Sequence, residues 1–416
     1  MLRVTNYCRL CLGKNIKIGL KLAPMPVGEK FFKKKIQKKK LKKFPISLGW
    51  CQKCNNVQTM EIINPEFLWQ DFTYLSAQTK AIVDHFGELS SLLIKRFKLT
   101  KKDLVVDIGS NDGTFLKFFK KKKIKVLGVD PAKNVAKIAI KNKINTIVEF
   151  FDLGTSKKIV NNFGFAKLIL CFNTFAHSEN LREIVNGISK TLAQNGIFVF
   201  ECQYLHDIYK KKIIGTIFHE HLYHHSLTSL KSLFQLYGLE IFDVKMVNIQ
   251  KGSILGFVCK KNQFSVNKNV KKLLELEHFS KDTSFIKLRE LKRFINLQKS
   301  HANKILKKFK KKDIAIYGAA RSGPTLAYNY SIDRYPQIIF DDHPLKVGRY
   351  SSMGSLFVRP TRDLLKINPK ICIVLAYLHL KNILKKNKKY IQRGGKFLSV
   401  YPKIELISKK NYKKFV

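Results

Sequence analysis

The sequence predicts an α/β fold in which a mainly parallel sheet is covered by helices on both faces. Short apolar runs at residues 104–108, 126–129, 168–171 and 196–200 have the length of buried strands and alternate with amphipathic stretches. A glycine-rich turn follows the first run, and the same alternation returns after residue 313. We therefore expect two Rossmann-like domains in one chain.

Apolar residues between positions 269 and 312 recur at helical spacing and predict a linker helix or a pair of helices: Leu288, Leu291, Ile295, Ala302, Ile305 and Phe309. Further strands are expected near 313–318, 337–341, 371–375 and 397–400. A length of 416 residues suits two or three domains. We divide the chain into a cysteine-bearing module (1–65), an α/β core (66–267), a helical linker (268–312) and a C-terminal Rossmann-like domain (313–416).

The chain is strongly basic, with 79 Lys and Arg against 29 Asp and Glu and a net charge of +50. Only twelve of the basic residues are Arg, and the lysines accompany many Ile, Asn and Phe, as a bias toward A- and T-rich codons would produce. The scattered lysine runs do not favour a nucleic-acid partner, although a basic RNA-binding methyltransferase stays an alternative.

No apolar run reaches the roughly 20 residues of a membrane helix, and the opening residues lack the apolar core of a signal peptide. We therefore expect a cytoplasmic protein without a membrane span. The sequence does not fix the oligomeric state, and a monomer is compatible with it.

Four of the eight cysteines form two Cys-x-x-Cys pairs, Cys8 with Cys11 and Cys51 with Cys54. Two such pairs can complete a tetrahedral thiolate cage that leaves no position open for water. We therefore predict a structural Zn²⁺ site. A redox dithiol is the alternative, but a redox pair is normally single and lies beside a βαβ pattern.

The turn after the first strand reads Asp107-Ile-Gly109-Ser-Asn111-Asp-Gly113, and Asp130 ends the next strand. Glycines there let a ligand approach the backbone, and a carboxylate at the second strand end can accept both ribose hydroxyls. The acidic Asn-Asp step disfavours a pyrophosphate and fits S-adenosylmethionine, which is cationic and unphosphorylated. We add Asn173, at the end of the strand near residue 170, to this predicted cofactor site. An ordinary tight turn is the alternative.

Histidines cluster at positions 219–225, and His177 follows the strand near residue 170. Histidine is the natural general base near neutral pH, and a neighbouring carboxylate can fix its tautomer. We interpret the cluster as acid–base machinery. Structural hydrogen bonding and a second metal, for which His219, Glu220 and His221 resemble a ligand run, stay as alternatives.

With these residues in view, the chain resembles the zinc-containing, S-adenosylmethionine-dependent sugar C-methyltransferases, which act on nucleotide-linked 4-keto-deoxysugars. The resemblance runs nearly end to end. Besides the four cysteines, it rests on residues 74–79, 108–113, 128–131, 173–177, 219–221, 317–320 and 342–349. It implies an N-terminal zinc module, a class I methyltransferase core and a C-terminal Rossmann-like domain.

The resemblance also implies a mechanism in which a base removes the proton beside the ketone and the resulting enolate attacks the sulfonium methyl group. The matching motif makes His221 the base and Glu220 its orienting partner. His177 and Tyr74 would contact the substrate or stabilise the enolate oxygen. The substrate would be a nucleotide-linked sugar.

Two departures from the family pattern matter. Phe218 stands where the family usually has Tyr, and Arg321-Ser322 stand where a Lys often follows the Gly-Ala-Ala turn. Arg321 could supply the charge from its neighbouring position, and Tyr223 is the candidate to replace the hydroxyl. An O- or N-methyltransferase acting on a related nucleotide sugar, and a scaffold that has lost turnover through Phe218, therefore stay as alternatives.

Overall fold

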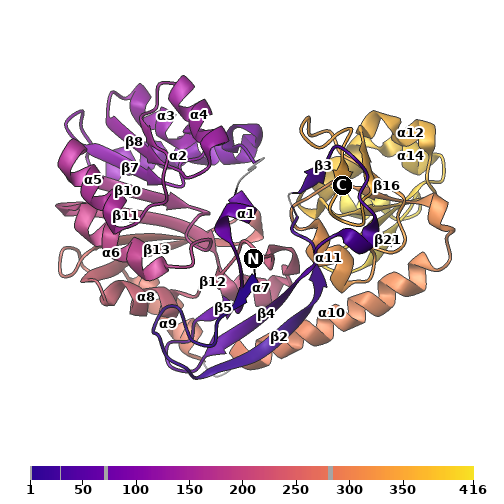
Figure 1. Ribbon diagram of the computed structural model, residues 1–416, viewed down its shortest axis with the longest axis horizontal. Coiled ribbons are helices and arrows are strands. Elements are labelled where there is room, and N and C mark those ends of the chain that lie inside the picture. The colour runs from indigo at the N-terminus through magenta and orange to yellow at the C-terminus, as the bar shows by residue number, and fades with distance from the viewer. Residues whose placement is uncertain (1, 29, 70–73, 280–283) are drawn as a thin grey trace.

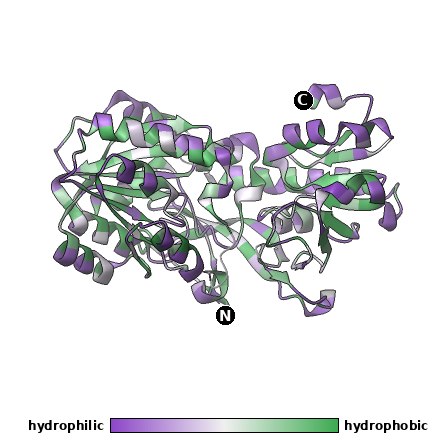
Figure 2. Ribbon diagram, turned by 90° about the horizontal axis from the view of Figure 1, so that it is seen from above, coloured by the Kyte–Doolittle hydropathy of each residue, from purple (hydrophilic) through white to green (hydrophobic). Residues whose placement is uncertain are grey.

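The computed structural model has two α/β lobes that lie side by side, with a long hairpin and a long helix that run from below the middle of the molecule to the second of them (Figure 1). It describes residues 2–28, 30–69, 74–279 and 284–416. We call the sheet domain around residues 80–260 the first lobe and the one around residues 314–416 the second lobe. Hydrophobic residues lie mainly on the strands and hydrophilic residues on the outer helices (Figure 2).

The first lobe is built on a seven-stranded sheet with the order β13-β14-β11-β10-β7-β8-β9. The strands are β7 (Leu104–Ile108), β8 (Lys125–Val129), β9 (Thr146–Ile147), β10 (Ala166–Phe172), β11 (Leu192–Gln203), β13 (Leu239–Val247) and β14 (Ser253–Lys260). The five strands from β9 to β11 pair in parallel, and β14 and β13 add antiparallel at one edge. The four apolar runs predicted as strands coincide with β7, β8, β10 and β11.

Helices cover both faces of this sheet, which confirms the predicted α/β core: α2 (Lys80–Arg96), α3 (Thr114–Lys121), α4 (Lys133–Lys141), α5 (Leu153–Phe163), α6 (Leu181–Thr191) and α8 (Leu227–Gln235). Helix α7 (Leu205–Lys211) packs instead with β2 (Ile16–Met25), β4 (Phe44–Cys51) and α10 (Ser284–Leu306). Helix α5 begins where the Asp152 carboxylate accepts the Thr155 N–H at 2.7 Å. Helix α8 begins where the Ser226 hydroxyl accepts the Ser229 N–H at 3.2 Å. Both contacts satisfy backbone donors that a helix start leaves open.

The second lobe has an eight-stranded sheet with the order β21-β20-β19-β15-β16-β18-β17-β3. Its strands are β3 (Phe31–Phe32), β15 (Ile314–Tyr317), β16 (Ile338–Phe340), β17 (Tyr350–Ser351), β18 (Phe357–Arg359), β19 (Ile371–Val374), β20 (Lys396–Ser399) and β21 (Glu405–Ile407). Its helices are α11 (Gly323–Asn329), α12 (Leu364–Ile367), α13 (Leu380–Lys386) and α14 (Lys388–Gln392). The five central strands are parallel, as a Rossmann-like domain requires.

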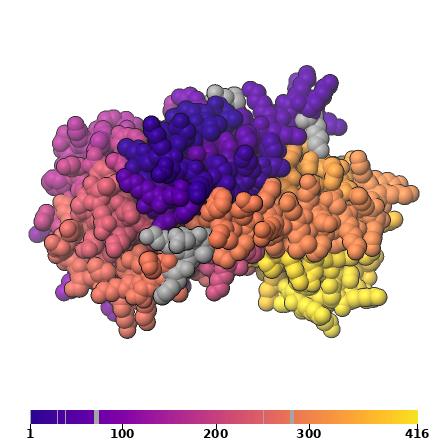
Figure 3. Space-filling view, turned by 90° about the horizontal axis from the view of Figure 1, so that it is seen from below, coloured from indigo at the N-terminus to yellow at the C-terminus, as the bar shows by residue number. Residues whose placement is uncertain are grey.

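The N-terminal segment shares strands with both lobes. Its main sheet has the order β12-β5-β4-β2, and its small sheet pairs β1 with β6. The elements are β1 (Leu2–Val4), β2 (Ile16–Met25), β4 (Phe44–Cys51), β5 (Val57–Thr59), β6 (Glu61–Ile63), α1 (Pro65–Trp69) and β12 (Tyr223–His224). Strand β12 comes from the first lobe, and β3 leaves the segment for the second lobe. The space-filling view shows the N-terminal residues, in indigo, against the first lobe and against the orange segment near residue 300 (Figure 3).

The predicted linker is a pair of helices, α9 (Lys268–Phe279) and α10 (Ser284–Leu306). Four of the six predicted apolar positions are fully buried on α10, whereas Ile305 and Phe309 are partly buried against the same core. Leu288 packs closely on β2: a Cβ added at Gly19 would lie 2.7 Å from the Cβ of Leu288. The four-part division of the chain stays a proposal, because strands cross between its parts.

Candidate active site

A cavity of about 500 Å³ lies at the carboxyl ends of β7, β8, β10 and β11, the edge of a parallel sheet where ligands of α/β proteins bind. The first lobe supplies most of its wall. The second lobe contributes Ala320, Arg321, Ser322, Lys346, Tyr377, Leu378 and His379. The lobes approach closely here, since a Cβ at Gly215 would lie 2.8 Å from the Tyr377 ring. The volume of the cavity is in the range of small-molecule sites.

The turn after β7 is shaped for a ligand that approaches the backbone. Gly109 has a left-handed φ of 77°, and a Cβ there would clash with the Thr174 side chain. The Asp130 carboxylate accepts the N–H of Asn111 at 2.8 Å and the N–H of Ala132 at 2.9 Å, which fixes its position at the end of β8. Gly109, Asn111 and Asp130 all line the cavity.

Asn173 also lines the cavity, but two residues predicted for the cofactor site do not. Asp107 is 4% exposed in β7, where burial and then the charge of Asp130 raise its pKa well above the ordinary value. Gly113 begins α3 with a φ of 74°, and a Cβ there would press on Ile144 at 3.0 Å. Both residues support the turn from behind.

The side chains of the Asn-Asp step have a role that the sequence did not reveal. Asn111 Oδ1 accepts the Ser76 N–H at 3.1 Å, and its Nδ2 donates to the Tyr74 carbonyl at 3.1 Å. Asp112 Oδ2 accepts the Ala77 N–H at 3.0 Å. The turn thus holds the segment 74–77 over the cavity, where Tyr74 is part of the wall. Burial raises the pKa of Tyr74, so its hydroxyl stays protonated and can donate.

His221 lies in the cavity wall with one ring nitrogen already assigned. Its Nδ1 lies 2.7 Å from the Thr216 carbonyl, an acceptor, so Nδ1 carries the proton and Nε2 has a lone pair. Burial lowers the pKa of His221 well below its ordinary value, and the adjacent His177 lowers it further because two protonated rings would repel each other. The ring is therefore neutral near pH 7 and able to take up a proton at Nε2. Phe218 packs on it at 4.0 Å between centroids.

His177 stands beside His221, with ring centroids 5.0 Å apart. Its Nδ1 lies 2.8 Å from the Glu220 carbonyl and its Nε2 lies 2.8 Å from the Asn173 carbonyl. Burial lowers its pKa to about 4, so the ring is neutral and donates to one carbonyl at a time. His177 lines the cavity, and its ring links the Asn173 turn to the histidine loop.

Glu220 was predicted to orient His221, and that role stays a prediction; the contact with a ring nitrogen of His221 that the structure shows comes from Thr216. The backbone carbonyl of Glu220 contacts His177, and its side chain is not in the cavity wall. The carbonyl of Thr216, five residues before His221, is what fixes the tautomer. No sequence signal marks a backbone carbonyl for this role, which explains why sequence reasoning missed it.

The other histidines of the cluster serve mainly as buried hydrogen-bonding groups. His219 Nε2 lies 3.1 Å from the Phe44 carbonyl, His225 Nε2 lies 3.4 Å from the Phe175 carbonyl, and His224 Nε2 lies 3.5 Å from the Thr59 hydroxyl. Burial lowers the pKa of His219 and His225 to about 4 and that of His224 to about 3. Tyr223, the candidate to replace the hydroxyl lost at Phe218, donates its own to the Glu179 carbonyl at 2.9 Å.

Two cations from the second lobe face the cavity. Arg321 follows the turn after β15, and Lys346 lies in the loop after β16. Lys346 is 8% exposed, and its Nζ donates to the Ala319 carbonyl at 3.0 Å. Sequence reasoning noted Arg321 as a departure and did not single out Lys346, because only the packing of the two lobes brings either of them opposite the histidines.

The four cysteines form one compact cluster, with all sulfur atoms within 4.8 Å of one another. Cys8 and Cys54 are 3.5 Å apart, as are Cys11 and Cys51, close to the roughly 3.8 Å that four zinc–sulfur bonds of about 2.3 Å require. A hydrogen bond with Cys54 lowers the pKa of Cys51, and one with Cys51 raises the pKa of Cys54. A divalent cation would neutralise these crowded thiolates, so the donor set fits Zn²⁺.

Three sequence families match the chain in succession. They are a zinc binding domain over residues 8–69, a methyltransferase domain over 83–244 and a C-methyltransferase C-terminal domain over 248–402. The C-methyltransferase NovU of Streptomyces niveus is 29% identical over 370 residues, which is 88% of each chain. The chain is an S-adenosylmethionine-dependent methyltransferase whose three domains are those expected of a zinc-containing C-methyltransferase. The first lobe of this C-methyltransferase is its class I methyltransferase core, and the predicted cofactors, S-adenosylmethionine and structural Zn²⁺, are confirmed.

Solved structures similar to the C-methyltransferase are more distant. An S-adenosylmethionine-dependent methyltransferase from Clostridium acetobutylicum is 14% identical, with a TM-score of 0.36, and covers 43% of this chain and 92% of its own. Magnesium protoporphyrin IX methyltransferase from Synechocystis is 11% identical, with a TM-score of 0.33. The match covers 47% of this chain and 89% of the Synechocystis chain. Within the described residues, the C-methyltransferase has no helix long and apolar enough to cross a membrane.

Proposed function

We propose that this C-methyltransferase methylates the carbon beside the ketone of a nucleotide-linked 4-keto-deoxysugar, with His221 as general base. The observation that carries the proposal is the geometry of His221. Its tautomer leaves Nε2 free of the proton, and the ring lines the same cavity as the glycine turn and Asp130. A proton acceptor and a nucleoside-binding turn in one cavity suit methylation of a carbon that must first lose a proton.

S-adenosylmethionine supplies an electrophilic methyl group on a cationic sulfur. Gly109, Asn111, Asp130 and Asn173 would hold it: the glycine allows close approach, and Asp130 has lone pairs for the ribose hydroxyls. The Asn111 and Asp112 side chains hold the segment 74–77 against the site. The residues of the cavity therefore fit this group.

His221 Nε2 would accept the proton from the carbon beside the ketone, and the electrons of the broken C–H bond would form the enolate. The developing charge on the ketone oxygen needs donors that are already in place. Tyr74 and Arg321 have such donors in the cavity wall, whereas the N–H of His177 is already donated to a backbone carbonyl. The carbanion then attacks the methyl group in line, and positioning dominates this step because the sulfonium is a good leaving group.

The nucleotide part of the substrate would bind the second lobe, which repeats the turn of the first. Gly318 follows β15 with a φ of 92°, and Asp341 follows β16. The Asp341 carboxylate accepts the N–H of Ala319 at 2.7 Å and the N–H of His343 at 2.8 Å. This is the arrangement of Asp130 in the first lobe, and it supports a second nucleoside site.

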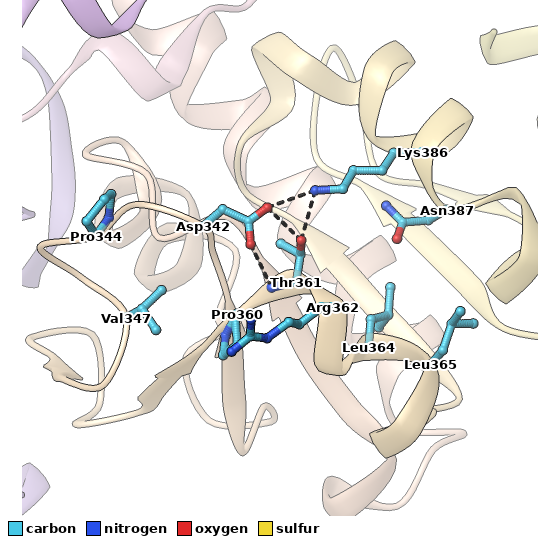
Figure 4. Close-up of a pocket in the computed structure, with 10 residues that line it drawn as sticks. All are labelled: Asp342, Pro344, Val347, Pro360, Thr361, Arg362, Leu364, Leu365, Lys386 and Asn387. Carbon is cyan, nitrogen blue, oxygen red and sulfur yellow. Dashed lines mark hydrogen bonds and ion pairs between the residues drawn. The ribbon is translucent and has the colours of Figure 1, made fainter.

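A cavity of about 630 Å³ lies beside this turn, between the loops after β16 and β18 and helix α13 (Figure 4). Asp342 accepts from Lys386 at 2.8 Å and from the Thr361 hydroxyl at 2.6 Å, so these three groups form one hydrogen-bonded cluster in its wall. We place the base and ribose here. Arg321 and Lys346, which face the first cavity, would bind the linking phosphates and direct the sugar toward His221.

The experiment that tests the proposal supplies methyl-¹³C S-adenosylmethionine with nucleotide-linked 4-keto-6-deoxysugars and locates the label by NMR. We expect a carbon-bound methyl group beside the ketone. A label on oxygen or nitrogen would overturn C-methylation at this site and establish the O- or N-methyltransferase alternative. No turnover of any such sugar would favour the degenerate scaffold with Phe218. A cytoplasmic location and a monomeric state stay predictions.

A further inference from the structure

A fully buried carboxylate lies behind the wall of the cofactor cavity. Glu201, near the end of β11, has no exposed side-chain surface, and its Oε2 lies 2.7 Å from His85 Nε2 on α2. Its neighbours along the strand, Phe200 and Cys202, are also buried. Burying a carboxylate is unfavourable, so a buried ion pair does not by itself add much stability. We therefore look for a role of Glu201 other than stabilising the fold.

Glu201 contacts Asn173 through both its backbone and its side chain. The Asn173 N–H donates to the Glu201 carbonyl at 2.9 Å, and Asn173 Nδ2 lies 3.5 Å from Glu201 Oε1. Asn173 has a left-handed φ of 54°, a conformation that asparagine tolerates better than most residues but that still needs support. Because Asn173 lines the cavity and its carbonyl contacts His177, its orientation shapes the cofactor half of the site.

The other partner fixes helix α2. Ile82 and Phe86, on the turns around His85, line the same cavity, and Phe86 stacks on Phe115 at 4.3 Å between centroids. Burial lowers the pKa of His85, but the hydrogen bond and charge of Glu201 outweigh it and raise that pKa above the ordinary value. The His85 ring and the Glu201 carboxylate thus join α2 to β11 directly behind the cavity.

We propose that Glu201 and His85 are positioning residues for the methyl donor, because their pair holds the Asn173 turn and helix α2 in the arrangement that binds it. The inference rests on the proposed placement of the donor between Gly109, Asp130 and Asn173. It adds a role for two side chains that are not in the cavity wall. Breaking the pair should weaken donor binding and leave substrate binding nearly unchanged.

The first lobe offers a matched control. Arg96, on the same helix α2, and Asp243, on β13, form another partly buried pair, 2.8 Å apart. Neither residue lines the cavity. Asp243 is 5% exposed in its side chain, and Arg96 stacks on Phe257 at 4.3 Å. Asp243→Asn should therefore destabilise the lobe without changing donor affinity.

The experiment measures S-adenosylhomocysteine binding by calorimetry, and steady-state kinetics, for the wild type, Glu201→Gln, His85→Gln, the double variant and Asp243→Asn. We expect the dissociation constant, and KM for S-adenosylmethionine, to rise about tenfold in each single variant of the pair, since each loses a charged hydrogen bond. The double variant should lose little more than either single one. KM for the sugar should change less than twofold, and Asp243→Asn should bind like the wild type.

The inference is overturned if both single variants bind S-adenosylhomocysteine within twofold of the wild type. It is also overturned if Asp243→Asn weakens binding as much as they do, because the effect would then be general destabilisation. His85→Gln keeps the test open if Glu201→Gln does not fold, since His85 is partly exposed. A wild type that does not bind S-adenosylhomocysteine would overturn the proposed donor site together with this inference.

Discussion

The two lobes carry the same backbone device at the same place in their sheets. In each, a glycine with left-handed φ follows the first central strand, Gly109 in one and Gly318 in the other. In each, an aspartate that ends the neighbouring strand accepts an N–H from that turn and the N–H two residues beyond itself. Asp130 and Asp341 are therefore equivalent in geometry.

The side chains on the two turns differ in charge. The first turn continues with Asn111 and Asp112, whose oxygens hold the segment 74–77. The second continues through two alanines to Arg321, and Lys346 lies nearby. Under the proposed function, the first lobe would take a cationic nucleoside and the second an anionic nucleotide. We infer from the comparison that the shared turn would provide a nucleoside site, while the residues after it would select the charge of the ligand.

The largest expected effect comes from removing the zinc. The module shares β12 with the first lobe and β3 with the second, and a Cβ at Gly28 would clash with the Arg321 carbonyl. Structural zinc can contribute about 10 kcal/mol to folding. Chelation, or Cys51→Ser, should therefore abolish binding in both lobes, as measured by calorimetry with S-adenosylhomocysteine and the nucleotide sugar. Cys259→Ala, outside the cluster, should retain both; unchanged binding without zinc would contradict the role of the module.

The next effect separates the two turns. Asp130→Asn should raise KM for S-adenosylmethionine at least tenfold and leave KM for the nucleotide sugar unchanged, because it weakens charged hydrogen bonds in one lobe. Asp341→Asn should do the reverse. Steady-state kinetics with each substrate varied in turn checks both. If either variant affects the two KM values equally, the lobes do not bind separate ligands.

A smaller effect tests the charge difference. Arg321→Gln and Lys346→Gln should each raise KM for the nucleotide sugar about tenfold, since each removes a charged contact to phosphate. KM for S-adenosylmethionine should not change. Lys410→Gln, at an exposed site, is the control. An equal effect at Lys410 would mean that the net charge of +50, and not this pair, attracts the substrate.

The last prediction is a difference in acid sensitivity between the two lobes. Burial lowers the pKa of His177, His219 and His225 to about 4 and of His224 to about 3, whereas unfolded histidine titrates near 6.5. The unfolded state therefore binds more protons below pH 6.5, and stability falls as pH drops from 6.5 toward 4. Hydrogen exchange should show earlier opening of β10 and β11 than of β15 and β19. Equal opening would contradict the assignment.

The sequence predicted local features well. The strands β7, β8, β10 and β11, the buried face of α10, the four cysteines and Asp130 all follow from apolar spacing or from motifs only a few residues long. Such signals are local because side-chain period and turn geometry are set by neighbouring residues. For the same reason the second glycine turn could be located in the sequence.

Features that depend on contacts between distant segments could not be predicted. The transfer of β3 to the second lobe, the Thr216 carbonyl on His221 and the placement of Lys346 in the cavity all join residues whose proximity only the folded chain defines. Glu220 shows the converse, because the carboxylate next to His221 in the sequence is not part of the cavity wall. Backbone acceptors leave no trace in residue type.

The most direct test of the account is proton exchange at the carbon beside the ketone, measured by NMR in deuterium oxide without S-adenosylmethionine. The account predicts that the wild type exchanges this hydrogen and that His221→Gln does not, while Glu220→Gln still does, because the Thr216 carbonyl contacts Nδ1 of the ring. Exchange that persists in His221→Gln, or none in a wild type that methylates the sugar, would contradict His221 as the base.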